Sequence, residues 1–147
     1  RAQVLNLLKR MNRETGASLV FITHDLGVAR FLCDRIAVMF FGRIVELGPT
    51  QRIFEDPRHP YTMSLIAARK AHGAVATDAD ESFSVADPAH ACNYAARCAR
   101  RIPACLTARP DLTEGEPGHE HACFSPLPHK ARREPATDLE RLEVLGP

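Results

Sequence analysis

Apolar residues are concentrated in the first 70 positions of this 147-residue chain, and this uneven distribution limits where a packed core can form. Up to Lys70 they recur at helical spacing or in short runs. Beyond it they become scarce, and four of the five cysteines appear. A segment so poor in apolar residues cannot fold on hydrophobic packing alone. We therefore expect an α/β core in residues 1–70, followed by a segment that needs another form of stabilisation.

Composition excludes several classes of protein. The formal net charge is +1, so no strong field attracts nucleic acid or an acidic lipid surface. The apolar runs are much shorter than the roughly 20 residues that cross a bilayer. The N-terminus has no apolar stretch of the secretory kind, and a helical pattern begins there without an initiator methionine. We therefore expect a cytosolic piece of a longer chain.

The first residues predict a helix followed by a strand. Apolar residues from Val4 to Met11 share one helical face, and Gly16 is a typical helix end. Residues 18–23 form a nearly continuous apolar run, which is typical of a buried parallel strand. His24 follows at the edge where open α/β sheets bind ligands, and could contact a phosphate or hold an attacking water. From position alone, a locally bonded helix-entry residue is the simpler explanation.

The next elements complete the pattern of an α/β domain. Asp25 is placed to cap a helix over residues 26–33. Two β-rich runs around a glycine predict an antiparallel hairpin over residues 35–47. Short helices are then expected over residues 51–55 and, after a proline that suits a helix start, over residues 61–70.

Three further parts are expected beyond Lys70. Residues 71–90 are rich in Ala, Asp, Glu and Ser, which predicts a linker. Residues 91–124 hold four cysteines and are expected to form a small, irregular extension. Residues 125–147 are rich in proline and charge, so we expect a flexible tail with at most a turn of helix near residues 139–145.

Several segments of the first part resemble ABC transporter ATPases. Residues 21–26 (Phe-Ile-Thr-His-Asp-Leu) resemble the switch-histidine loop of that family. Residues 33–39 and 42–50 resemble the strand and hairpin that follow this loop, and residues 5–8 resemble the helix after the family's D-loop. The resemblance implies the C-terminal part of an ABC-type nucleotide-binding domain, with parallel strands, a hairpin and helices. It also implies that His24 contacts the γ-phosphate of ATP and helps to position the hydrolytic water.

The family's other catalytic motifs are not found in the sequence. No glycine is followed by lysine, so there is no phosphate-binding Walker A loop, and no two glycines are adjacent as in the signature motif. No acidic Walker B strand precedes Arg1. ATP and Mg²⁺ are therefore cofactors that the resemblance implies for the family, and we expect the chain alone to be inactive.

Residues 54–62 (Phe-Glu-Asp-Pro-Arg-His-Pro-Tyr-Thr) resemble the His-Pro-Tyr segment of oligopeptide and dipeptide importer subunits. From the residues themselves, Pro60 is expected to begin a helix, with Tyr61 packed beneath it and His59 in a structural role. The resemblance implies an ATPase subunit at the cytoplasmic face of the membrane, with transmembrane permease subunits and a second homologous ATPase as partners, and no nucleic acid. Nickel importers share this extension, so nickel stays an alternative substrate.

The four clustered cysteines are candidate metal ligands. They follow the spacing Cys92-x5-Cys98-x6-Cys105-x17-Cys123, which fits no common zinc motif because zinc pairs usually lie two to four residues apart. Four thiolates are the usual ligand set of an iron–sulfur cluster. Nearby arginines could offset the cluster's negative charge, or be ordinary solvated surface.

The resemblance to peptide-importer subunits also implies a [4Fe–4S] cluster on these cysteines. Zinc is the second possibility, since His90, His119 and His121 are spare ligands, and disulfides are the third. The cluster's expected role is to stabilise a segment without a core. The fifth cysteine, Cys33, is expected to be a small buried hydrophobic residue.

Three hypotheses about function follow. The first is a subunit that energises peptide import. The second is a non-enzymatic iron–sulfur or zinc module, in which residues 1–70 serve only as a scaffold. The third is a truncated, inactive remnant. An upstream Walker A and signature segment would separate the first from the third, and metal analysis bears on the second.

Overall fold

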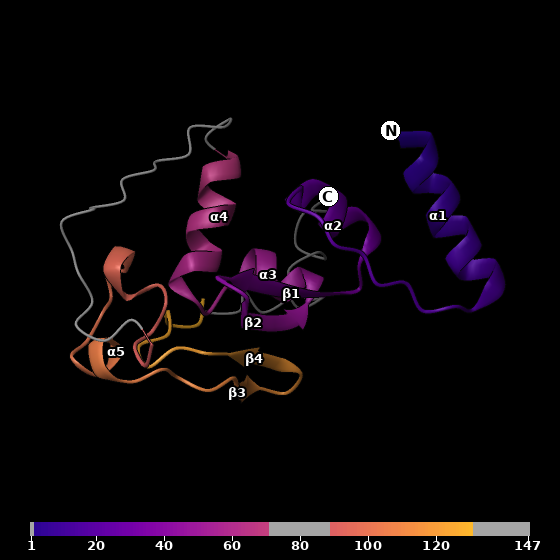
Figure 1. Cartoon of the computed structure of the whole chain (residues 1–147). Coiled ribbons are helices and arrows are strands. Elements are labelled where there is room, and N and C mark those ends of the chain that lie inside the picture. The colour runs from indigo at the N-terminus through magenta and orange to yellow at the C-terminus, as the bar shows by residue number, and fades with distance from the viewer. Residues whose placement is uncertain (1, 71–88, 131–147) are drawn as a thin grey trace, which may run out of the picture.

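A computed structural model describes residues 2–70 and 89–130 of the chain. The terminal helix turn predicted above and all but the last two residues of the predicted linker lie outside these ranges. In the first part a pair of helices, a strand hairpin and a second pair of helices follow one another, whereas the second part has only short elements (Figure 1). The elements in chain order are α1 (Ala2–Thr15), α2 (Leu26–Leu32), β1 (Arg35–Phe40), β2 (Arg43–Pro49), α3 (Thr50–Glu55), α4 (Pro60–Lys70), a 3₁₀ turn (Ala95–Arg97), α5 (Ala104–Thr107), β3 (Thr113–Glu116) and β4 (His119–His121).

The two N-terminal helices agree with the sequence prediction. Helix α1 ends before Gly16, which has a φ of +66° that glycine adopts without steric cost. Helix α2 begins after Asp25, whose Oδ1 accepts hydrogen bonds from Gly27 N (2.8 Å) and Val28 N (3.2 Å). None of the helices in residues 2–70 and 89–130 is long and apolar enough to cross a membrane.

The buried parallel strand predicted over residues 18–23 is not formed. This segment has no regular secondary structure, and Val20 and Ile22 are 89% and 94% exposed. A strand needs a neighbour to pair its backbone groups. Within the described ranges every strand belongs to one antiparallel sheet that does not include this segment. The prediction is therefore wrong for these residues, because the apolar run lacks the pairing partner that its pattern implies.

The predicted hairpin is confirmed and supplies one side of the core. Strands β1 and β2 pair antiparallel across a turn at Phe41 and Gly42, which have φ values of +46° and +74°. Every second residue of β1 points inward. The buried core combines side chains from the hairpin, α2, α3, α4 and the cysteine-containing part: Ala29, Ile36, Val38, Phe40, Val45, Ile53, Phe54, Ile66, Tyr94 and Cys98.

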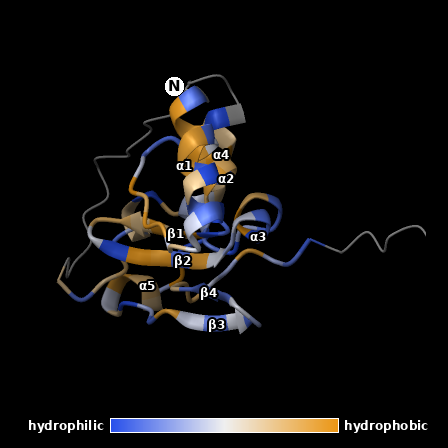
Figure 2. Cartoon of the chain, turned by 90° about the vertical axis from the view of Figure 1, so that its right-hand side faces the viewer, coloured by the Kyte–Doolittle hydropathy of each residue, from blue (hydrophilic) through white to orange (hydrophobic). Residues whose placement is uncertain are grey.

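The sheet extends from the hairpin into the C-terminal part of the chain. Its strand order is β1-β2-β4-β3, and Glu46 on β2 pairs with His121 on β4. Figure 2 shows that β2 is largely hydrophobic whereas β3 is pale to hydrophilic, as expected for an inner and an edge strand. Residues predicted to be irregular thus contain two short strands that join the same sheet as residues 35–49.

A buried carboxylate connects three elements of this fold. Glu46 is 0% exposed and accepts hydrogen bonds from the backbone N–H groups of Arg58 (2.7 Å) and His59 (2.9 Å). Its Oε1 also lies 2.7 Å from Nε2 of the buried His119 on β4. One side chain of β2 therefore fixes both the start of α4 and the added strand β4.

His59 makes stability depend on pH. Burial lowers its pKa from 6.5 to about 4, with Glu46 raising it and His121 lowering it. Its Nδ1 accepts a hydrogen bond from Tyr61 N (3.1 Å), a bond that only the unprotonated nitrogen can make. Between pH 6.5 and about 4, His59 is therefore protonated in the unfolded chain but neutral in the folded chain.

We therefore predict that stability falls as the pH is lowered from 6.5 to 4, with a His59 contribution of about 3 kcal/mol. Urea unfolding followed by circular dichroism across this range measures the effect. The His59→Asn variant, whose amide oxygen can replace the Nδ1 acceptor, should lose most of the slope. Equal slopes in both proteins would contradict the assignment to His59.

Candidate functional site

The four predicted cysteine ligands come from separate turns of the C-terminal part. Cys92 and Cys98 flank the 3₁₀ turn, Cys105 lies in α5, and Cys123 follows β4. Cys98 and Cys105 are buried, whereas Cys92 and Cys123 are half-buried. Each of the other three thiols raises the pKa of Cys123 electrostatically, so all four lie in one neighbourhood.

Hydrogen bonds to backbone carbonyl groups hold this neighbourhood together. Cys92 N donates to Cys105 O (2.9 Å), which joins the first and third cysteines directly. Ala95 N donates to Cys92 O (3.0 Å) and Cys98 N to Ala95 O (3.3 Å), which closes the 3₁₀ turn between two cysteines. Arg109 Nε donates to Ala91 O (3.2 Å) beside Cys92. The cysteines are therefore positioned by the backbone, although the segment has few aliphatic residues.

The four cysteine sulfurs do not form a tight group in the described residues. Among the residues that the structure describes, no three of the four cysteine sulfurs lie within 4.8 Å of one another. The thiols are thus near enough to interact electrostatically but not gathered around one point.

Two features of the surroundings act in opposite directions on the ionisation of the thiols: burial disfavours the thiolate, and backbone N–H groups stabilise it. Burial raises the pKa of Cys92 and Cys98, and raises that of Cys123 to about 11. Backbone N–H groups act in the opposite direction: those of Tyr94 and Ala95 stabilise the Cys92 thiolate, and that of Ser125 stabilises the Cys123 thiolate. Thiolates are therefore disfavoured without a cation, although backbone donors for them are already in place.

His24 lies apart from the cysteines. It sits exposed in the bend before α2, whereas α5 lies at the opposite side of the molecule (Figure 1). The next residue, Asp25, holds the bend through the N-cap bonds and through its own N–H, which donates to Thr23 Oγ1 (2.9 Å). The backbone N–H groups of Val28 and Gly27 lower the pKa of Asp25, so the capping carboxylate stays ionised. The structure thus holds the backbone around His24 and leaves the imidazole accessible.

The His-Pro-Tyr segment has the structural role predicted for it. Pro60 begins α4, and His59 is only 1% exposed. The Tyr61 ring packs against Phe40 (4.5 Å between centroids) and Tyr94 (5.5 Å). This aromatic group joins the hairpin, α4 and the cysteine-containing segment.

Cys33 agrees with its prediction, whereas the pair formed by Glu46 and His119 was not predicted from the sequence. Cys33 is half-buried against the core, and burial raises its pKa, as expected for a hydrophobic packing residue. Glu46 and its partner His119 were not predicted as a pair. The signal for Glu46 was weak: an acidic residue inside an apolar strand pattern suggests a buried partner, but not which one.

Comparison with known proteins identifies the region that contains the His-Pro-Tyr segment. Residues 45–105 match the family described as "Oligopeptide/dipeptide transporter, C-terminal region". This match covers β2 from Val45 onward, α3, α4 and the first three clustered cysteines.

Longer relatives match most of the chain. A putative peptide import ATP-binding protein of Brucella ovis is 37% identical over 128 residues, which is 84% of this chain and 40% of the relative. The dipeptide transport ATP-binding protein DppF of Escherichia coli is 39% identical over 132 residues, covering 85% of this chain and 39% of that protein. YkfD of Bacillus subtilis, a putative oligopeptide transport ATP-binding protein, is 36% identical over 129 residues. The match covers 83% of this chain and 39% of YkfD.

The chain thus spans about 40% of the length of the curated relatives that it matches. The expected family is confirmed: this chain carries the C-terminal region of the oligopeptide/dipeptide transporter family.

Proposed function

We propose that this chain is part of an ATP-binding subunit that energises the import of oligopeptides or dipeptides. The observation that carries the proposal is the similarity to peptide import ATP-binding proteins, which extends over 128 residues and includes the matched region 45–105. Such a subunit would work at the cytoplasmic face of the membrane, with permease subunits and a second, homologous ATPase as partners.

Within this proposal His24 is the switch histidine. Its exposure leaves the imidazole available to a ligand, and the capped start of α2 fixes the backbone beside it. A histidine so placed can hydrogen-bond the γ-phosphate of ATP and hold the attacking water in line. The phosphate cradle and the Mg²⁺ ligands would come from outside these 147 residues, which lack a Gly-Lys loop.

A chimera tests this role. We predict that a protein in which this chain replaces the matching segment of E. coli DppF hydrolyses ATP, and that His24→Ala lowers its turnover by about 100-fold or more. Because His24 would act on the hydrolytic step, ATP affinity should change much less than turnover. Steady-state hydrolysis and ATP titration measure the two effects separately.

Two controls accompany the chimera. His90→Ala changes an exposed histidine of the cysteine-containing part and should leave hydrolysis unchanged. The 147-residue chain alone should show no micromolar affinity for ATP. Full hydrolysis by the His24→Ala chimera would refute the switch role, and tight ATP binding by the chain alone would refute its dependence on a missing phosphate loop.

The four-cysteine segment is proposed to hold a [4Fe–4S] cluster as a structural element, with zinc as the alternative. A single zinc with bonds of about 2.3 Å draws its sulfurs to within ~3.8 Å of one another. The sulfurs of Cys92, Cys98, Cys105 and Cys123 have a wider arrangement, in which no three lie within 4.8 Å of one another. An iron–sulfide cube separates its ligands more widely than a single ion does, so the cluster is compatible with this spacing.

The local charges also favour a thiolate-ligated cluster. Arg100 stabilises the Cys98 thiolate and Arg109 the Cys92 thiolate, and backbone N–H groups donate toward three of the four sulfurs. Hydrogen bonds to the ligand sulfurs are a common feature of iron–sulfur sites.

We predict that the chain purified without oxygen is brown and contains about four iron and four sulfide per molecule. Serine in place of any one of the four clustered cysteines should reduce the iron content and the visible absorption. The matched control is Cys33→Ser, which should retain both because Cys33 packs against the core elsewhere. A colourless protein with one zinc per chain would contradict the iron–sulfur cluster and support a zinc site.

A further inference from the structure

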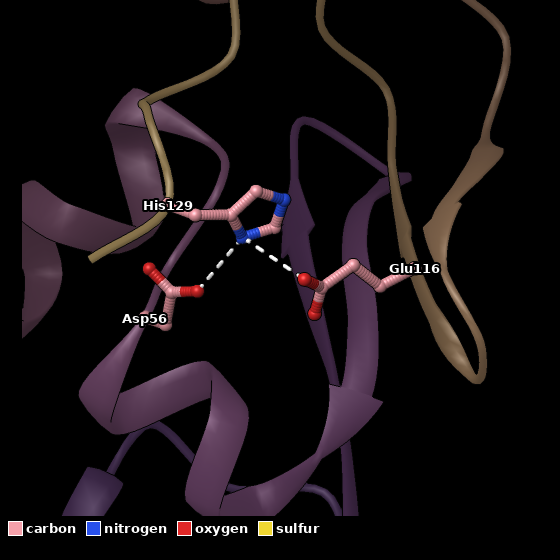
Figure 3. Close-up of side chains that lie close together, drawn as sticks. All are labelled: Asp56, Glu116 and His129. Carbon is pink, nitrogen blue, oxygen red and sulfur yellow. Dashed lines mark hydrogen bonds and ion pairs between the residues drawn. The ribbon is translucent and has the colours of Figure 1, made fainter. Parts of the chain in front are cut away.

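Three side chains from distant parts of the chain converge beside the sheet. Asp56 follows α3, Glu116 ends β3, and His129 lies in the segment after β4 (Figure 3). His129 Nδ1 is 2.9 Å from Asp56 Oδ2 and 3.3 Å from Glu116 Oε1. Within the described part of the chain, this is the one group of three potential ligand atoms lying within 4.8 Å of one another.

The other oxygen of each carboxylate has a separate partner, a hydrogen-bond donor for Asp56 and an ion pair for Glu116. Asp56 Oδ1 accepts a hydrogen bond from Lys130 N (2.9 Å), and Glu116 Oε2 pairs with Arg52 (3.0 Å). Asp56 is 7% exposed, so its carboxylate cannot turn freely toward solvent. These partners leave Oδ2, Oε1 and Nδ1 directed at one another, and outer contacts of this kind orient the ligands of metal sites.

We propose that Asp56, Glu116 and His129 bind a divalent transition-metal ion such as Mn²⁺. One imidazole nitrogen and two carboxylate oxygens suit first-row ions of this kind better than Ca²⁺, which takes six to eight oxygen ligands. Metal–ligand bonds of about 2.1 Å separate adjacent ligands by roughly 3.0–3.4 Å. The separations of 2.9 Å and 3.3 Å at His129 Nδ1 lie close to this range, and the two carboxylate oxygens lie within 4.8 Å of each other.

The ion would close the C-terminal segment onto the sheet. Asp56, Glu116 and His129 belong to three different stretches of the chain, and Leu127 N already donates to Arg58 O (2.9 Å) nearby. Arg52, which also lies 3.8 Å from Asp56 Oδ2, compensates one of the two negative charges.

Mn²⁺ is the probe because thiolates bind it weakly, so the cysteine segment interferes less than it would with zinc. Titration without nucleotide, followed by the electron paramagnetic resonance of free Mn²⁺, should give one site per chain. Glu116→Gln and His129→Gln should each weaken binding by at least ~10-fold, the lower end of what losing an outer-shell partner costs. The matched control is Glu55→Gln, an exposed carboxylate one residue from Asp56, which should bind normally.

Pulsed resonance on the bound ion provides an independent readout. The wild-type complex should show coupling to an imidazole nitrogen, and the His129→Gln variant should lose it. Circular dichroism checks that each variant is folded. The His129 side chain is 39% exposed, so its replacement should leave the fold intact. Absence of Mn²⁺ binding, equal affinity in all four proteins, or a bound ion without nitrogen coupling would each overturn the proposal.

Discussion

The hydrogen bonds of one buried carboxylate connect the parts of this structure. Removing the Glu46 side chain from water is costly, and such a group is tolerated in a core only when its oxygens are well bonded. Here two backbone N–H groups at the start of α4 and the His119 imidazole provide those bonds. Because these partners lie 12, 13 and 73 residues away, the same interaction fixes the His-Pro-Tyr segment and the strand that precedes Cys123.

The cysteine-containing segment is therefore part of the same packed structure as the hairpin. Strand β4 pairs with β2, and Ala122 N donates to Val45 O (2.9 Å) immediately before Cys123. Tyr94 lies between the first two clustered cysteines and packs against Phe40 of β1. In the proposed subunit, a cluster on these cysteines would thus stabilise the surface next to the ATPase core, rather than a separate appendage.

Local signals predicted local structure well. The capping carboxylate of Asp25, the glycine of the hairpin turn and Pro60 at the start of α4 each act within a few residues, and each lies where the sequence indicated. The strand predicted over residues 18–23 failed because strands depend on partners that periodicity does not identify. For the same reason, no local signal identified His119 as the partner of Glu46 or indicated the group around His129. Their members lie up to 73 residues apart.

Native-state hydrogen exchange on the chain and on its Glu46→Gln variant tests the central claim, that Glu46 joins core and cysteine segment into one cooperative unit. The account predicts that the amides of Arg58, His59 and Ala122 open with one free energy in the wild type. The variant places an amide N–H₂ against backbone donors, so all three should lose about 3 kcal/mol of protection together. If Ala122 opened at much lower free energy than His59, or kept its protection in the variant, the two parts would be independent and the account would be wrong.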